Sequence, residues 1–300
     1  MITRTSYGNW AHTVTLSNDA IELVATLDVG PRIIRFGTIG GPNLFKEFPD
    51  QLGGTNENEW KIRGGHRLWH APEAKPRSYA LDNAPVDCEA AGDFTLRLTP
   101  PPETENGIQK QIEIVLSPDD NVVTMTHRIT NIGPWGIELA PWALTVMAPG
   151  GMAIMPLPEK RPHTEVLTPD LPLVLWSYTD FTDNRLQLGR HYITLRQDAA
   201  KGPTKIGMGQ PLGWAAYLNQ GMLFVKYFDY EPSMIYPDFG CNFETYTNEE
   251  MLEVESLGPL SLLEPGESVE HDETWRLVPN APAVSSEDEI ESLLRPLIEA

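Results

Sequence analysis

The chain has 300 residues, of which 41% are hydrophobic, and it carries 22 Lys and Arg against 42 Asp and Glu, for a net charge of −20. The apolar content is enough for a large packed core, which excludes a disordered chain. The negative charge repels a nucleic-acid backbone or an anionic membrane surface over most of the protein, so neither is expected as a partner.

The N-terminal residues contain no apolar stretch of signal-peptide length, and no run approaches the roughly 20 apolar residues that span a bilayer. The two cysteines, Cys88 and Cys241, are far apart in the sequence and favour neither a disulfide framework nor a cysteine-based metal site. We therefore expect a cytoplasmic protein without a bound cofactor or metal. The sequence leaves the oligomeric state open.

Most apolar residues fall in short runs rich in Val, Ile, Thr, Tyr and Phe, and these runs predict β-strands. In chain order, hairpin patterns occur at residues 12–17 with 20–27, 112–116 with 122–129, 212–218 with 222–228, and 251–257 with 268–277. Pro and Gly are spread along the chain and do not collect in one linker. These patterns predict one all-β, antiparallel domain over residues 1–300.

The C-terminus has a different pattern. Ser286 and Glu289 have the spacing of a helix capping box, and apolar residues recur on one helical face at Ile290, Leu293, Leu294, Leu297 and Ile298. This predicts an amphipathic helix at about residues 286–299 that packs on the sheet.

Residues 64–73, with the sequence GGHRLWHAPE, concentrate groups that could carry chemistry. His66 and His70 share a face in either a strand or a helical turn. Arg67 offers a forked donor and Trp69 a stacking platform, which are the residue types of a sugar site. Two alternatives remain open: a structural turn with hydrogen-bonded histidines, or a divalent metal held by His66, His70 and Glu73.

Residues 236–260 contain the best acid–base candidates. In a strand over residues 251–257, Glu253 and Glu255 point to the same side. They could be ordinary solvent-facing carboxylates, or a pair lodged in a cleft, where burial would raise the pKa toward the range of a general base. Lys226, between Val225 and Tyr227, is a further candidate for contact with an anion or hydroxyl.

Read in order, several motifs resemble the galactose mutarotase-like (aldose 1-epimerase) superfamily, and the whole chain resembles a bacterial branch of it. The motifs are residues 30–34 (GPRII), 65–69 (GHRLW), 129–131 (ITN) before a Trp-rich strand, and 255–256 (ES) ahead of 263–267 (LEPGE). The resemblance implies a β-supersandwich that binds a sugar in a cleft on one concave sheet.

In mutarotases, a glutamate takes the proton of the anomeric hydroxyl while a histidine protonates the ring oxygen. Matched by motif, Glu255 corresponds to this glutamate, His66 and Arg67 to an early substrate-binding pair, and Asp238 to a carboxylate that binds sugar hydroxyls. The family's central histidine is missing, because residues 139–147 contain Trp142 but no His. Either His66 or His70 then replaces the acid, or the cleft binds sugar without catalysis.

The leading hypothesis is therefore a sugar isomerase of the aldose epimerase or mutarotase type. Glu255 would be the base and His66 or His70 the acid, and the sugar would be contacted by Arg67, Trp69, Asp238, Lys226 and Trp142. A second hypothesis is a non-catalytic sugar-binding or sensing module. A third is a metal-assisted lyase or isomerase that acts on an acidic sugar.

Overall fold

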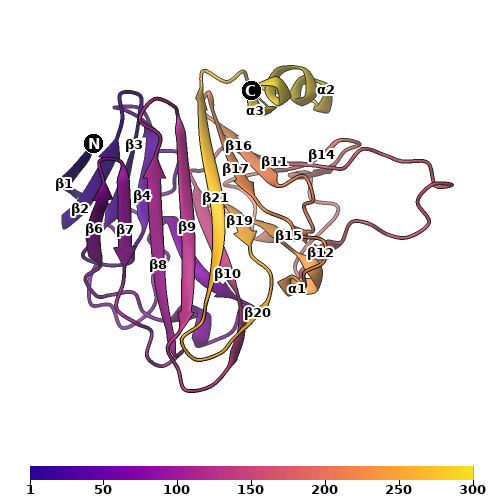
Figure 1. Ribbon diagram of the computed structural model, residues 1–300. Coiled ribbons are helices and arrows are strands. Elements are labelled where there is room, and N and C mark those ends of the chain that lie inside the picture. Colours follow the sequence, from indigo (N-terminus) through magenta and orange to yellow (C-terminus); the bar gives the residue numbers. More distant parts are fainter. Residues whose placement is uncertain (300) are drawn as a thin grey trace.

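Two antiparallel sheets pack face to face in the computed structural model, which describes residues 1–299 (Figure 1). Sheet A runs in the order β1 (Ile2–Tyr7), β2 (Trp10–Ser17), β3 (Ile21–Thr26), β4 (Ile33–Thr38), β5 (Gly65–Ala71), β10 (Ile137–Met147), β19 (Leu252–Leu257), β18 (Phe243–Thr247), β15 (Thr204–Met208) and β12 (Leu173–Leu175), with β20 (Ser261–Leu263) paired to β10. Sheet B runs in the order β13 (Leu186–Leu188), β14 (Tyr192–Arg196), β11 (Met152–Pro156), β16 (Trp214–Asn219), β17 (Met222–Phe228), β21 (Ser268–Pro279), β9 (Val122–Asn131), β8 (Ile108–Leu116), β7 (Thr95–Thr99) and β6 (Asp87–Gly92).

Three of the predicted hairpins are confirmed, as β2 with β3, β8 with β9, and β16 with β17. The fourth, residues 251–257 with 268–277, is wrong. β19 lies in sheet A between β10 and β18, whereas β21 lies in sheet B between β17 and β9. The connection between these two strands contains β20, which pairs with β10 in sheet A. The chain then continues into sheet B.

The main apolar core lies between the two sheets. Strand alternation directs one face of each sheet inward, as in β8, where Ile112, Ile114 and Leu116 are buried. Near its centre, the rings of Phe45 and Trp275 lie 5.5 Å apart in an edge-to-face arrangement. The all-β, antiparallel class predicted from the sequence is confirmed.

The C-terminal helix is also confirmed and packs on the outside of sheet B. It consists of α2 (Glu287–Glu289), a π-helical turn η2 (Ile290–Leu294) and α3 (Arg295–Glu299). Ser286 caps it, because its hydroxyl accepts a hydrogen bond from the backbone N–H of Glu289. Ile290, Leu294 and Ile298 lie against apolar side chains of sheet B, whereas Leu293, expected on the same face, is exposed. Within residues 1–299, none of the helices has the length and apolar character needed to cross a membrane.

The outer face of sheet A, which points away from sheet B, is covered by connections between strands. Trp60, from the connection between β4 and β5, and Tyr79, from the 3₁₀ turn η1 (Arg77–Tyr79), pack on aromatic residues of β5 and β10. The connection from β11 to β12 extends to one side of the molecule before it returns to sheet A (Figure 1). This covered face carries the candidate site.

Candidate functional site

Cross-strand pairing lines up residues that are distant in the sequence on the outer face of sheet A. Arg67 of β5 lies opposite Leu144 of β10, Leu144 opposite Glu255 of β19, and Glu255 opposite Glu244 of β18. Directly opposed residues of antiparallel strands point to the same face. Four neighbouring strands thus place one arginine and two glutamates in a single row.

Glu255 is at the centre of this row and is completely buried, with 0% of its surface exposed. Its Oε2 accepts hydrogen bonds from Trp142 Nε1 at 2.9 Å and from Lys205 Nζ at 3.1 Å, while its Oε1 has no partner among the described residues 1–299. Burial raises the pKa of Glu255 above its usual value. Glu253 is buried as well, so the solvent-facing interpretation of the two carboxylates is wrong.

Lys205 of β15 joins the two glutamates of the row. Its Nζ lies 2.6 Å from Glu244 Oε2 and is sandwiched between two indole rings, 4.8 Å from the centre of Trp142 and 4.7 Å from that of Trp176. Burial alone would lower the pKa of Lys205, but the carboxylates of Glu255 and Glu244 raise it above its usual value. Burial raises the pKa of Glu244 well above normal. The group is therefore a dry cluster of charged and titratable side chains.

Arg67 is set among aromatic rings beside this cluster. Its Nη2 donates to Glu253 Oε1 at 3.1 Å, and its guanidinium lies 4.6 Å from the centre of the Trp69 ring and 5.4 Å from that of Trp60. Its Nε and Nη1 are buried and have no hydrogen-bond partner in the described part of the chain. Such unpartnered buried donors are rare in proteins and indicate a position where a polar ligand group can bind.

Trp176 covers the cluster from the turn after β12. An added Cβ at Gly207 of β15 would lie 3.1 Å from the Trp176 ring and 2.6 Å from Cys241 Sγ, so only glycine lets the indole lie this close to the sheet. Asp238, in the short turn α1 (Pro237–Gly240), is half-buried, and its negative charge contributes to the raised pKa of Glu244.

No family model matches the sequence, and no curated protein matches it. Solved structures do match. A galactose mutarotase-like protein from Lactobacillus casei ATCC 334 is 10% identical, with a TM-score of 0.59, covering 89% of this chain and 100% of that one. A candidate aldose 1-epimerase from Escherichia coli K12 is 13% identical, with a TM-score of 0.56, covering 93% of this chain and 100% of that one. The chain has the galactose mutarotase-like fold.

Within this galactose mutarotase-like fold, four of the sequence-predicted site residues come together. Arg67, Trp69, Trp142 and Glu255 all lie on the outer face of sheet A, where Trp69 pairs directly with Trp142 in the row next to Arg67 and Glu255. Asp238 approaches the same region from α1.

The two histidines of β5 point the other way, into the space between the sheets. His66 Nδ1 lies 2.9 Å from Thr145 Oγ1, and its Nε2 lies 2.8 Å from His127 Nε2. His70 is fully buried, neither ring nitrogen has a partner within the residues that the structure describes, and burial lowers its pKa to about 3. The strand alternation that puts Arg67 beside Glu255 thus directs both histidines away from it.

Lys226 also lies between the sheets. Its Nζ is 2.7 Å from Glu273 Oε1 and donates to the backbone carbonyls of Ala143 and Val254, each at 3.2 Å. Burial alone would raise the pKa of Glu273, but Lys226 and the nearby histidines hold it well below its usual value. The structure therefore places Lys226 in an internal ion pair, on the opposite side of sheet A from Glu255.

The residues of the metal hypothesis are separated. Glu73 accepts a hydrogen bond from Tyr79, while His66 lies with His127 and Glu273, whose potential ligand atoms are within 4.8 Å of one another. In that group the two imidazoles already contact each other, and Glu273 is neutralised by Lys226. A network of hydrogen bonds and one ion pair accounts for these buried polar groups without an ion.

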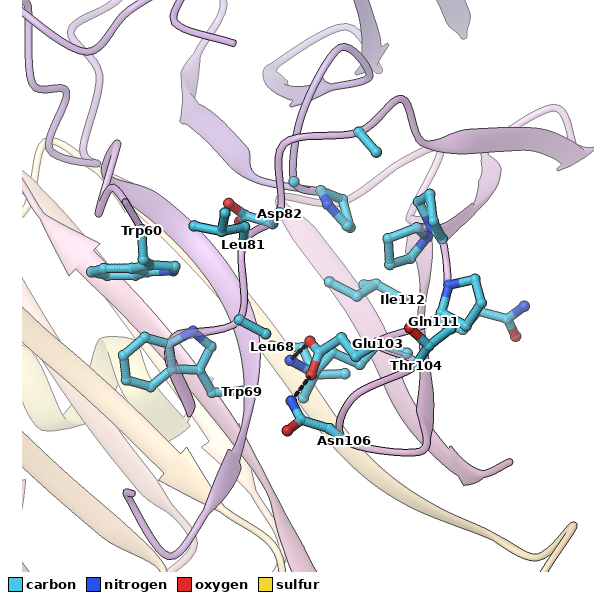
Figure 2. A pocket seen from close by; sticks show the side chains of 18 of the residues that line it. Trp60, Leu68, Trp69, Leu81, Asp82, Glu103, Thr104, Asn106, Gln111 and Ile112 are labelled. Carbon is cyan, nitrogen blue, oxygen red and sulfur yellow. Dashed lines mark hydrogen bonds and ion pairs between the residues drawn. The ribbon is translucent and has the colours of Figure 1, made fainter. Parts of the chain in front are cut away.

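A pocket of 380 Å³ opens beside Trp60 and Trp69. It lies between β5 and the segment that links β7 to β8. Figure 2 shows Trp60 and Trp69 on one side and Ile112 on the other, with Glu103 bonded to Asn106 below. The residues that line it do not include Glu255. Trp60 and Trp69 line the pocket and also contact Arg67, so the pocket adjoins the candidate site on that side.

Sequence reasoning missed Glu244, Lys205 and Trp176. Alternation gave a usable signal for two of them, because residues 243–247 (FETYT) and 204–208 (TKIGM) each place a charged residue within an apolar or Thr-rich strand. A charged residue inside such a strand is either solvent-exposed or paired. The pairing itself depends on strand order, which the sequence did not indicate.

Proposed function

We propose that this protein is a sugar isomerase of the aldose 1-epimerase type, which interconverts the anomers of a small-molecule sugar on the outer face of sheet A. One observation carries the proposal. Glu255, fully buried, has one carboxylate oxygen held by Trp142 and Lys205, while its other oxygen is unpartnered. A positioned carboxylate with one oxygen free to accept a proton is what a general base requires.

In this mechanism Glu255 removes the proton of the anomeric hydroxyl, and the bond between the anomeric carbon and the ring oxygen breaks. The resulting open-chain aldehyde rotates about its first carbon–carbon bond and closes on the opposite face. The raised pKa of Glu255 makes the carboxylate a stronger base than one in water. Because Trp176 lies over Lys205, the sugar enters when this indole moves aside.

The surrounding residues supply binding groups for such a substrate. Trp69 and Trp142 offer flat apolar faces to the C–H surface of a sugar ring, and Arg67 has two unpartnered donor nitrogens for hydroxyl oxygens. Asp238 provides an acceptor at the edge of the cluster. A sugar hydroxyl both donates and accepts, so it suits either Arg67 Nε or Glu255 Oε1 as a partner.

The test is exchange NMR of anomeric interconversion on a panel of aldoses and uronic acids, with wild type beside Glu255→Gln. The variant keeps the shape of the side chain but cannot accept the proton, so we expect its rate to fall about a hundredfold to ten-thousandfold. Full activity in Glu255→Gln would refute the role of this residue. A melting curve with and without sugar controls for folding and binding.

A non-catalytic sugar-binding module is the second candidate. It is favoured by the orientation of His66 and His70, which face away from Glu255 and so leave the usual histidine acid without a replacement from β5. This candidate predicts that a sugar raises the melting temperature while wild type does not accelerate anomeric exchange.

A further inference from the structure

Ring opening needs an acid as well as a base, and the cluster around Glu255 contains a second carboxyl group. Glu244 is the direct cross-strand partner of Glu255 and is also fully buried. Both side chains reach the same ammonium, with Lys205 Nζ 2.6 Å from Glu244 Oε2 and 3.1 Å from Glu255 Oε2. The anomeric hydroxyl and the ring oxygen are bonded to the same carbon, so an acid and a base this close suit them.

The hydrogen bonds distinguish the two carboxyl groups. Glu255 accepts from Trp142 and from Lys205, and donors of this kind stabilise an ionised carboxylate. Glu244 Oε2 contacts Lys205 alone, at 2.6 Å, and Glu244 Oε1 has no partner within residues 1–299, so fewer donors stabilise its ionised form. A protonated carboxyl can lie this close to the ammonium through its carbonyl oxygen, which accepts from the N–H.

The charge balance of the cluster agrees with this assignment. Arg67 and Glu253 neutralise each other, which leaves the single positive charge of Lys205 against Glu244 and Glu255. Asp238 adds further negative charge near Glu244. An uncompensated buried charge is costly, and one proton on the carboxyl pair leaves the buried group neutral.

We infer that Glu244, in its protonated form, is the general acid that replaces the missing histidine of this fold and donates its proton to the ring oxygen. The inference rests on the proposed function and deepens it, because it assigns the second catalytic group at the same site. Lys205 is a positioning residue that holds both carboxyl groups in place.

The protons balance over one turnover. Glu255 takes the hydroxyl proton and Glu244 gives its proton to the ring oxygen as the carbon–oxygen bond breaks, which yields the open-chain aldehyde. On closure, Glu244 takes back the proton of the attacking hydroxyl, while Glu255 returns its proton to the aldehyde oxygen. Both groups return to their starting states, and no oxidant, reductant or other reactant is consumed.

The experiment compares Glu244→Gln and Glu244→Asp with wild type by exchange NMR over a range of pH. An acid must be protonated to act, so the wild-type rate should fall as pH rises through the pKa of Glu244. We expect the rate of Glu244→Gln to be about a hundredfold or more below that of wild type. Its rate should also no longer fall as the pH rises, a fall that we call the alkaline decline. The Asp variant keeps a carboxyl group and should retain part of the rate together with the decline.

Glu273→Gln is the matched control, because it alters another fully buried glutamate paired with a lysine, on the opposite side of sheet A. It should lower stability while keeping the pH dependence of the rate. Suppose that wild type is active and Glu255→Gln is inactive. If the rate of Glu244→Gln is then within about threefold of the wild-type rate, or still falls at alkaline pH, the acid assignment of Glu244 is wrong while the proposed function stands. A wild type that accelerates no aldose overturns the proposed function, and the acid assignment with it.

Discussion

Replacing His70 by Leu should remove a large part of the acid sensitivity of this protein. His70 is fully buried between the sheets, neither ring nitrogen has a partner, and burial lowers its pKa from the usual 6.5 to about 3. The folded protein therefore holds His70 neutral, whereas the unfolded chain binds a proton below about pH 6.5. Stability from this group is present above that pH and is lost as the pH falls toward 3.

The magnitude follows from the two pKa values. Between pH 7 and pH 5, an unfolded histidine with a pKa of 6.5 gains about 2 kcal/mol from protonation, while a folded one with a pKa near 3 gains almost nothing. The free energy of unfolding of His70→Leu should thus decrease by about 2 kcal/mol less than that of wild type over this interval. At pH 7 the variant should be at least as stable, because Leu has a similar volume and removes two unpaired nitrogens.

Urea unfolding of both proteins at pH 7, 6 and 5, followed by tryptophan fluorescence, measures this difference. Other titrating groups, including the carboxyls with raised pKa, are common to both proteins and cancel in the comparison. Parallel stability curves would refute the assignment of His70 as a buried neutral histidine. If the folded variant loses anomeric exchange, then His70 is the acid, as the sequence suggested, and the assignment of Glu244 is wrong.

Two further substitutions test the two sides of sheet A. Lys226→Met leaves the Glu273 carboxylate buried without its ion-pair partner, so the free energy of unfolding in urea should fall by about 3–5 kcal/mol, and a fall below about 1 kcal/mol would contradict the ion pair. Trp142→Phe removes the N–H that stabilises ionised Glu255, which should raise the pKa of Glu255 and, under the proposed function, move the acidic decline of the exchange rate to higher pH. An unmoved acidic decline would show that this hydrogen bond does not tune the base.

The sequence predicted the fold well where the information is local. Alternation and turn residues identified the hairpins of residues 112–129 and 212–228, and the capping residues identified the C-terminal helix. The predicted hairpin of residues 251–257 with 268–277 is wrong because partner choice depends on strands from elsewhere in the chain. β19 pairs with β10 and β18, and β21 pairs with β9 and β17. Local patterns do not contain that information.

The same distinction applies to the site. Period-two alternation in β5 separates His66 and His70 from Arg67 and Trp69, although all four were expected to line one site. Which face would carry Glu255 depended on the register between β5, β10 and β19. Glu244 and Lys205 join the cluster through the register of β18 and β15, which the sequence does not reveal.

The large sequence separation between the paired residues also affects folding during synthesis. The Arg67–Glu253 contact spans 186 positions and the Trp142–Glu255 contact spans 113. During synthesis from the N-terminus, Arg67, Trp142, Lys205 and Glu244 all leave the ribosome before Glu255, so a partial chain exposes an incomplete set of charges. Chains dominated by such distant contacts fold slowly. The candidate site is therefore complete only after β19 has joined sheet A between β10 and β18.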